Sequence, residues 1–180
     1  MRAILLASAV FMAAQMPQAA LAKQWSFAAD PDGRTAVAYY RPQALNQISF
    51  FCSLPGYNPQ AWGKLYGDNH PLPKTAPGTY TLEIGLNDLP TTRAEAAKEI
   101  QNWRANVMFV VDGRQIQVPP LEYHIIFESL FVDIPAQHPL FEALGSGNKA
   151  VVWVQNNGDQ MGIPLSGSGR SLGQLASACP

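Results

Sequence analysis

The chain has 180 residues and a formal net charge of −1, and its charged residues, 14% of the total, form no run of either sign. This pattern excludes the dense positive surface that nucleic-acid binding requires. The length matches one domain that can bury a core without a metal ion.

The first 22 residues have the pattern of a secretory signal peptide. Arg2 supplies the positive charge, residues 3–14 form an apolar stretch too short to cross a bilayer of roughly 30 Å, and Ala20-Leu21-Ala22 matches a cleavage site. The chain has no Asn-x-Ser/Thr sequon, which favours bacterial export. We therefore predict a signal peptide over residues 1–22, a single mainly-β domain over residues 23–180, and a periplasmic or secreted location with no transmembrane segment after signal removal.

The chain contains two cysteines, Cys52 and Cys179. Exported proteins fold in an oxidising compartment, so we predict that these two residues form a disulfide. The alternative is a pair of buried free thiols, which behave as small apolar side chains.

Period-two alternation of apolar residues predicts strands along most of the chain. The predicted strands are residues 24–28, 35–40, 47–53, 79–86, 107–111, 114–118, 121–127, 150–155 and 161–165. Residues 79–86 alternate most clearly, so we expect one face of that strand to be solvated. Asp112-Gly113 is a strong hairpin signal because both turn positions need φ > 0. Residues 129–134 are apolar and ambiguous.

Three segments are predicted as helices. A capping box at residues 92–95 begins the first, which we expect over residues 92–102. Residues 139–144 form a short second helix that we expect Gly145 to close. Ser168 is expected to cap the last helix, whose inward-facing apolar positions are Leu172, Leu175, Ala176 and Cys179.

Many short strands with turn signals between them, few helices and no βαβ alternation together indicate the fold class. We predict a mainly-β fold: an antiparallel β-sandwich or barrel with two or three short helices, the last at the C-terminus.

Residues with reactive side chains form no recognised catalytic or metal-binding motif. Neither Ser146 nor Ser168 lies in a Gly-x-Ser-x-Gly motif, and the glycines at 167, 169 and 173 lack the spacing of a dinucleotide fingerprint. The histidines show no close pairing of the metal-binding kind; they are His70, His124 and His138. We predict no catalytic residue, no metal and no cofactor.

One predicted strand face would bring two carboxylates together. In alternating register, Glu122 and Glu128 share a face with His124. The alternative is that this row is the solvated side of a sheet.

Residues 54–77 form a long loop rich in proline and glycine, and such loops tend to be functional or mobile. Its rings Tyr57, Trp62 and Tyr66 occur among amide side chains and the carboxylate of Asp68, a mixture that binds sugars and peptides. We predict these three residues as the ligand-binding surface. The alternative is that the rings fold back over the sandwich edge.

The part of the chain from residue 107 onward resembles the invasion-associated locus B family of small exported bacterial proteins. The matching motifs are the hairpin around Asp112-Gly113, residues 139–144, Gly147, residues 150–155, Gly158, and Ile163-Pro164-Leu165-Ser166-Gly167 leading into Leu172. The resemblance implies a non-enzymatic envelope protein with a role in invasion or stress, and it supplies no catalytic residue.

Two functions therefore stay open. The first is a non-enzymatic periplasmic or envelope protein that acts as a binding or scaffolding module, with an envelope protein, a peptide or a glycan as its partner. The second is a small periplasmic hydrolase with a non-obvious active site.

Overall fold

The computed structural model describes residues 24–32, 34–42, 47–61, 74–85, 104–124, 129–156 and 158–179. The predicted signal peptide and the predicted helix over residues 92–102 lie outside these described residues. Both stay predictions.

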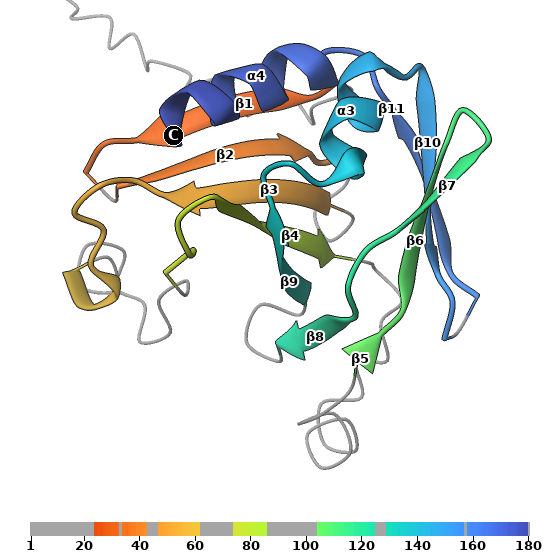
Figure 1. Cartoon of the computed structure of the whole chain (residues 1–180), viewed down its shortest axis with the longest axis horizontal. Helices are drawn as coiled ribbons and strands as arrows, with labels where there is room; N and C mark the ends of the chain where they lie inside the picture. The colour runs from red at the N-terminus through yellow and green to blue at the C-terminus, as the bar shows by residue number, and fades with distance from the viewer. Residues whose placement is uncertain are drawn as a thin grey trace, which may run out of the picture.

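The described strands form two antiparallel sheets (Figure 1). Sheet A has seven strands in the order β1-β2-β3-β4-β9-β8-β5, and sheet B has four in the order β11-β10-β6-β7. The strands are β1 (Ser26–Asp30), β2 (Thr35–Tyr40), β3 (Gln47–Ser53), β4 (Thr79–Gly85), β5 (Arg104–Ala105), β6 (Val107–Val111), β7 (Arg114–Gln117), β8 (Leu121–His124), β9 (Ser129–Pro135), β10 (Lys149–Val154) and β11 (Gln160–Pro164). The predicted mainly-β antiparallel fold is confirmed. The ambiguous segment at 129–134 is the strand β9.

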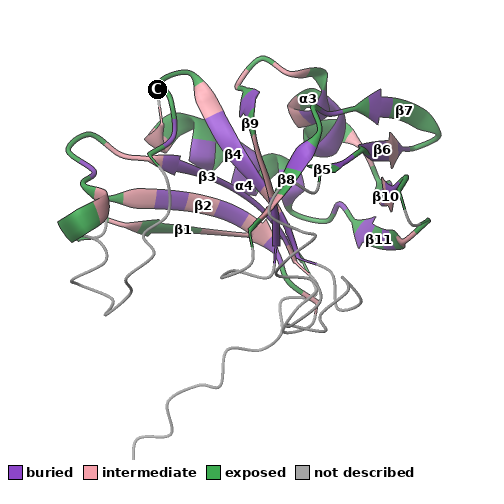
Figure 2. Cartoon of the chain, turned by 90° about the horizontal axis from the view of Figure 1, so that it is seen from below, coloured by how far each residue is buried: buried purple, intermediate pink, exposed green. Residues whose placement is uncertain are grey.

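The core lies between the inner faces of the two sheets, where alternate residues of each strand meet. Phe50 of β3, Leu82 of β4 and Phe109 of β6 are fully buried there. The central strands β3 and β4 are mostly buried, whereas the edge strand β1 is half-buried or exposed (Figure 2). Burial of this apolar surface is the main force that holds the sheets together.

Two helices complete the cover of sheet A. Figure 1 shows α4 (Ser168–Ala178) lying along β1 and β2. Sheet B lies at the opposite end of the molecule, and α3 (Pro139–Ser146) lies between α4 and sheet B. Phe141 of α3 packs edge-on against Phe50 and Tyr80, with ring centroids 5.1 and 5.0 Å apart. No helix in the described part of the chain is long and apolar enough to span a membrane.

The chain passes directly from sheet A to sheet B at Asn106, which lies between β5 and β6. The N–H of Asn106 donates to Oδ1 of Asn156 over 2.6 Å, and its carbonyl accepts from the N–H of Gln155 over 2.8 Å. Both backbone groups are therefore tied to the turn after β10. This corner joins one edge of sheet A to sheet B.

Cys52 and Cys179 form a disulfide, as predicted. Their Cα atoms lie 6.3 Å apart, within the range that a disulfide spans. Cys52 is buried on the inner face of β3, and Cys179 follows the last turn of α4. The bond attaches the end of α4 to the middle of sheet A.

The start of α4 differs from the prediction that Ser168 would cap it. Gly167, with a φ of 83°, is the N-cap residue and makes no side-chain cap bond. The buried Ser168 hydroxyl instead lies 2.6 Å from the Leu144 carbonyl oxygen and 2.7 Å from that of Leu165. The hydroxyl therefore links α4 to α3. The prediction that Ala176 faces inward is also wrong, because Ala176 is exposed.

The two helices meet at a pair of glycines. The prediction that Gly145 closes α3 is wrong. Gly145 lies inside the helix, and Gly147 is the C-cap residue. A Cβ atom added at Gly169 of α4 would overlap the carbonyl oxygen of Gly145. The close contact of α3 with α4 therefore requires glycine at position 169.

The β6–β7 hairpin has the predicted turn, since Asp112 and Gly113 have φ values of 48° and 88°. The Asp112 carboxylate also accepts hydrogen bonds from the backbone N–H groups of Asn148 (2.9 Å) and Lys149 (3.2 Å). The bond from Asn148, followed by that from Lys149, lowers the pKa of Asp112 below its ordinary value of 3.8. This carboxylate connects the hairpin to the start of β10.

We expect Asp112→Asn to lower the thermal midpoint at neutral pH, with a deficit that disappears in acid. Because the folded-state pKa is lowered, the charged carboxylate stabilises the fold fully above its ordinary pKa of 3.8 and loses this effect as pH falls through the lowered pKa. Asparagine tolerates the positive φ, so the turn itself should persist. Thermal melts of both proteins from neutral pH into acid check this; an equal deficit at every pH would contradict it.

Candidate functional site

The aromatic loop predicted to bind a ligand is described only in part. Tyr57 is 5% exposed, so its ring packs against protein and does not form a surface platform. Burial also raises the pKa of its phenol group. The expectation that this ring is exposed is therefore wrong, and its role in binding stays a prediction. Trp62 and Tyr66 lie outside the described residues, and their role stays a prediction.

The outer face of sheet A is polar but not fully solvated, which corrects the expectation for the strand at 79–86. Thr81 is only 2% exposed. Its hydroxyl donates to Oδ1 of Asp133 over 2.5 Å and lies 3.3 Å from the Thr75 hydroxyl. The Ser49 hydroxyl likewise donates to Oε2 of Glu83 over 2.6 Å. Hydrogen bonds between side chains on neighbouring strands thus satisfy the polar groups of this face.

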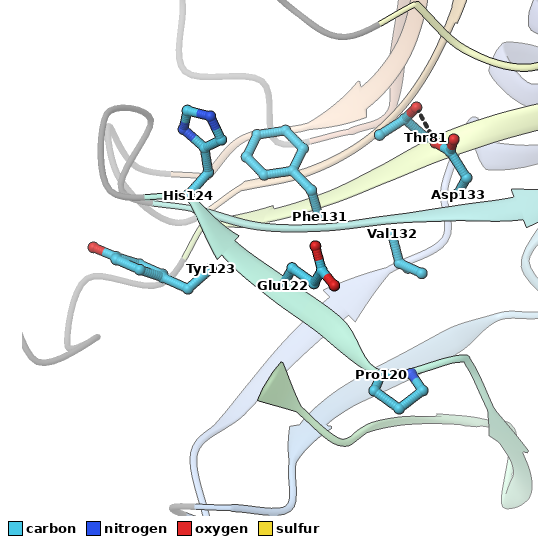
Figure 3. A pocket seen from close by; sticks show the side chains of 8 residues that line it. All are labelled: Thr81, Pro120, Glu122, Tyr123, His124, Phe131, Val132 and Asp133. Atoms are coloured by element: carbon cyan, nitrogen blue, oxygen red, sulfur yellow. Dashed lines mark hydrogen bonds between the residues drawn. The ribbon is translucent and has the colours of Figure 1, made fainter. Parts of the chain in front are cut away.

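A cleft of about 350 Å³ opens at this sheet where β8 and β9 separate (Figure 3). Its lining side chains come from β4, β8, β9 and the residue before β8; they are Thr81, Pro120, Glu122, Tyr123, His124, Phe131, Val132 and Asp133. The volume is in the range of sites that hold small ligands, which combine apolar walls with a few polar groups. We therefore take it as the candidate site.

Two carboxylates give the cleft its charge. Glu122 of β8 and Asp133 of β9 are both exposed. Oε1 of Glu122 accepts a hydrogen bond from Nη2 of Arg104 over 2.8 Å, and these two side chains are 69% and 68% exposed. Exposed ion pairs of this kind contribute little free energy. A cationic ligand could therefore replace Arg104 at small cost.

Aromatic rings form the apolar part of the site. Phe131 lies edge-on to His124 (Figure 3), with ring centroids 6.0 Å apart. It also lies edge-on to Phe51, with ring centroids 6.4 Å apart. Tyr123 and Val132 are half-buried and pack against the core. The cleft therefore combines negative charge with apolar and aromatic surface.

The predicted carboxylate row is described in part. Glu122 and His124 do share the outer face, because they pair with Phe131 and Ser129 of β9. Glu128 lies outside the described residues. Among the described residues, no group of three or more His, Cys, Asp and Glu side chains could hold a metal ion.

Sequence reasoning missed Asp133, which is the second carboxylate of the cleft. Its segment gave no decisive pattern, although β9 alternates when read as a strand: Leu130, Val132 and Ile134 face inward and Asp133 faces outward. A strand assignment for 129–134 would have put Asp133 on the same sheet face as Glu122.

Comparison with known proteins gave no match: no protein-family model, no curated protein and no solved structure aligns significantly with the chain. The resemblance to the invasion-associated locus B family is not tested by this result. It stays a prediction.

Proposed function

We propose that this protein is a non-enzymatic, exported binding module, and that the β8–β9 cleft holds a ligand with a positive charge and an apolar surface. The observation that carries the proposal is the composition of the cleft. Glu122 and Asp133 flank apolar and aromatic side chains in a cavity of about 350 Å³. Carboxylates next to an apolar wall favour cations with an organic body.

The disulfide supports export as part of the proposal. Cys52 and Cys179 are joined across the core, and bonds of this kind persist in oxidising compartments such as the bacterial periplasm. The signal pattern of residues 1–22 agrees with such a location.

The arrangement of hydroxyl and carboxylate favours binding over hydrolysis. A hydrolase needs a nucleophile that its base activates and its substrate can reach. The Thr81 hydroxyl donates to Asp133 but is only 2% exposed, so a substrate could not approach it. We therefore assign the Thr81–Asp133 pair a structural role, as a hydrogen bond between β4 and β9.

Titration of the purified protein with N-acetyl-arginine amide, followed by heteronuclear NMR, tests the proposal. We expect shifts at β8 and β9, and none with N-acetyl-glutamate amide. Glu122→Gln and Asp133→Asn should each weaken binding about threefold to tenfold, because each removes a charged hydrogen-bond acceptor. Glu142→Gln, on the exposed surface of α3, is the matched control and should bind as the unaltered protein does.

Two results would overturn the proposal. One is equal binding of the arginine and glutamate derivatives. The other is turnover of a chromogenic ester, glycoside or peptide that is lost in Glu122→Gln, which would support the hydrolase instead.

A further inference from the structure

The β8–β9 cleft lies where sheet A is incomplete. β9 pairs with β4 along all of Ser129–Pro135, but it pairs with β8 only over residues 129–131. From residue 132 onward, β9 therefore has a strand neighbour on one side only, among the residues that the structure describes. The open side faces the cleft, since Val132 and Asp133 both line it.

The register determines which backbone groups face this opening. Directly after β9, the N–H of Ala136 donates to the carbonyl oxygen of Gly78 over 2.9 Å. In an antiparallel ladder the residues of one strand turn their backbone groups to alternate sides. The backbone N–H and C=O groups of the even-numbered residues of β9 therefore point toward β4, and those of Asp133 point toward β8.

A proline explains why the β8–β9 pairing stops at this point. Glu122 pairs with Phe131, so the same register places Pro120 opposite Asp133. Proline has no N–H and cannot supply the hydrogen bond that the Asp133 carbonyl would accept. The described residues provide no other backbone partner for Asp133 on this side. Its N–H and C=O are thus open to a strand from outside.

We propose that the cleft binds an extended peptide, which adds to β9 at Asp133 as a short strand and places a basic side chain beside Glu122 and Asp133. This inference rests on the proposed function and deepens it, because it identifies the cationic ligand as a peptide. Strand addition at an open sheet edge is a recurrent mode of recognition: backbone hydrogen bonds supply affinity, and alternate side chains supply specificity.

Strand geometry sets the side-chain pattern of the peptide. The residue paired with Asp133 carries its side chain on the outer face, where both carboxylates lie, so that residue is arginine or lysine. Its two neighbours turn toward the inner side of the sheet, where the half-buried Val132 packs against the core. The cleft therefore selects an apolar, basic, apolar sequence. Arg104 provides an internal example, since its guanidinium already donates to Glu122 over 2.8 Å.

A pair of peptides tests the backbone pairing on the unaltered protein. The first is acetyl-Thr-Val-Arg-Val-Thr-amide, and the second has the same sequence with a methyl group on the arginine backbone nitrogen. Methylation removes the N–H that the Asp133 carbonyl would accept and leaves the charge unchanged. We expect the methylated peptide to bind about tenfold more weakly or worse by calorimetry.

Two proline variants test the same pairing from the protein side. Pro120→Thr restores an N–H opposite Asp133, so β8 should extend, close the edge and reduce affinity for the unmethylated peptide about tenfold or more. Pro119→Thr is the matched control. Its new N–H points away from β9, because backbone groups alternate along the strand, and its affinity should stay within about twofold.

The outcomes separate this inference from the proposed function. Equal affinity of the two peptides would overturn strand addition, while continued binding of N-acetyl-arginine amide would leave the proposed function standing. Absence of binding by both the peptides and the arginine amide would overturn both. If Pro120→Thr does not fold, the comparison of the two peptides on the unaltered protein still decides whether the peptide adds to β9 as a strand.

Discussion

Replacing both Cys52 and Cys179 with alanine is expected to lower the free energy of unfolding by about 4 to 5 kcal/mol. The disulfide links residues 127 positions apart, so its loss releases a large loop in the unfolded chain. It would also release the end of α4 from β3. Guanidinium denaturation of the variant and the unaltered protein measures the difference.

Reduction of the unaltered protein is the control, because it opens the bond without changing either residue. We expect the reduced protein to unfold at about the same denaturant concentration as the double variant. If the reduced and oxidised proteins unfold at the same concentration, the disulfide does not stabilise the fold and the prediction is wrong.

Trp25→Ala is expected to cost about 3 to 5 kcal/mol of stability, the range for removal of a large buried aromatic side chain. Trp25 is 4% exposed, and its ring stacks on Phe50 and Tyr40 with centroids 6.1 and 6.4 Å apart. Its indole N–H donates to the Pro164 carbonyl oxygen over 3.1 Å. The side chain therefore joins the inner face of sheet A to the end of β11.

Trp25→Phe separates the contribution of the ring to stability from that of the hydrogen bond, in the same denaturation experiment. It keeps an aromatic ring but removes the donor to Pro164. Trp153→Phe is the matched comparison, because the indole N–H of Trp153 has no partner in the described part of the chain. Trp25→Phe should cost more than Trp153→Phe; the reverse order would contradict a contribution from this hydrogen bond.

The elements that could be predicted from the sequence are those set by local chemistry. The β6–β7 turn follows from Asp112 and Gly113, which both tolerate positive φ. The amphipathic strands follow from alternation because each has one face in the core. The disulfide followed from the number of cysteines, since Cys52 has one candidate partner.

The site could not be predicted in this way because it depends on pairing between distant segments. Pro119 and Pro120 are visible as strand breakers, but nothing local indicates that Pro120 lies opposite Asp133. That fact depends on the β8–β9 register. The burial of Tyr57 is likewise a property of packing rather than of a loop rich in proline. The start of α4 was mispredicted because Ser168 bonds α3, a contact absent from local sequence.

The position of α4 determines the order in which the fold can form. A ribosome produces β1 to β4 long before α4, yet Trp25 donates its backbone N–H to Ser166 and α4 packs on β1 and β2. Strands that pair before α4 is made would therefore have an inner face open to water, and such faces aggregate. Contacts between distant segments also form slowly. This topology therefore favours folding after the whole chain, with α4 and both cysteines, is available.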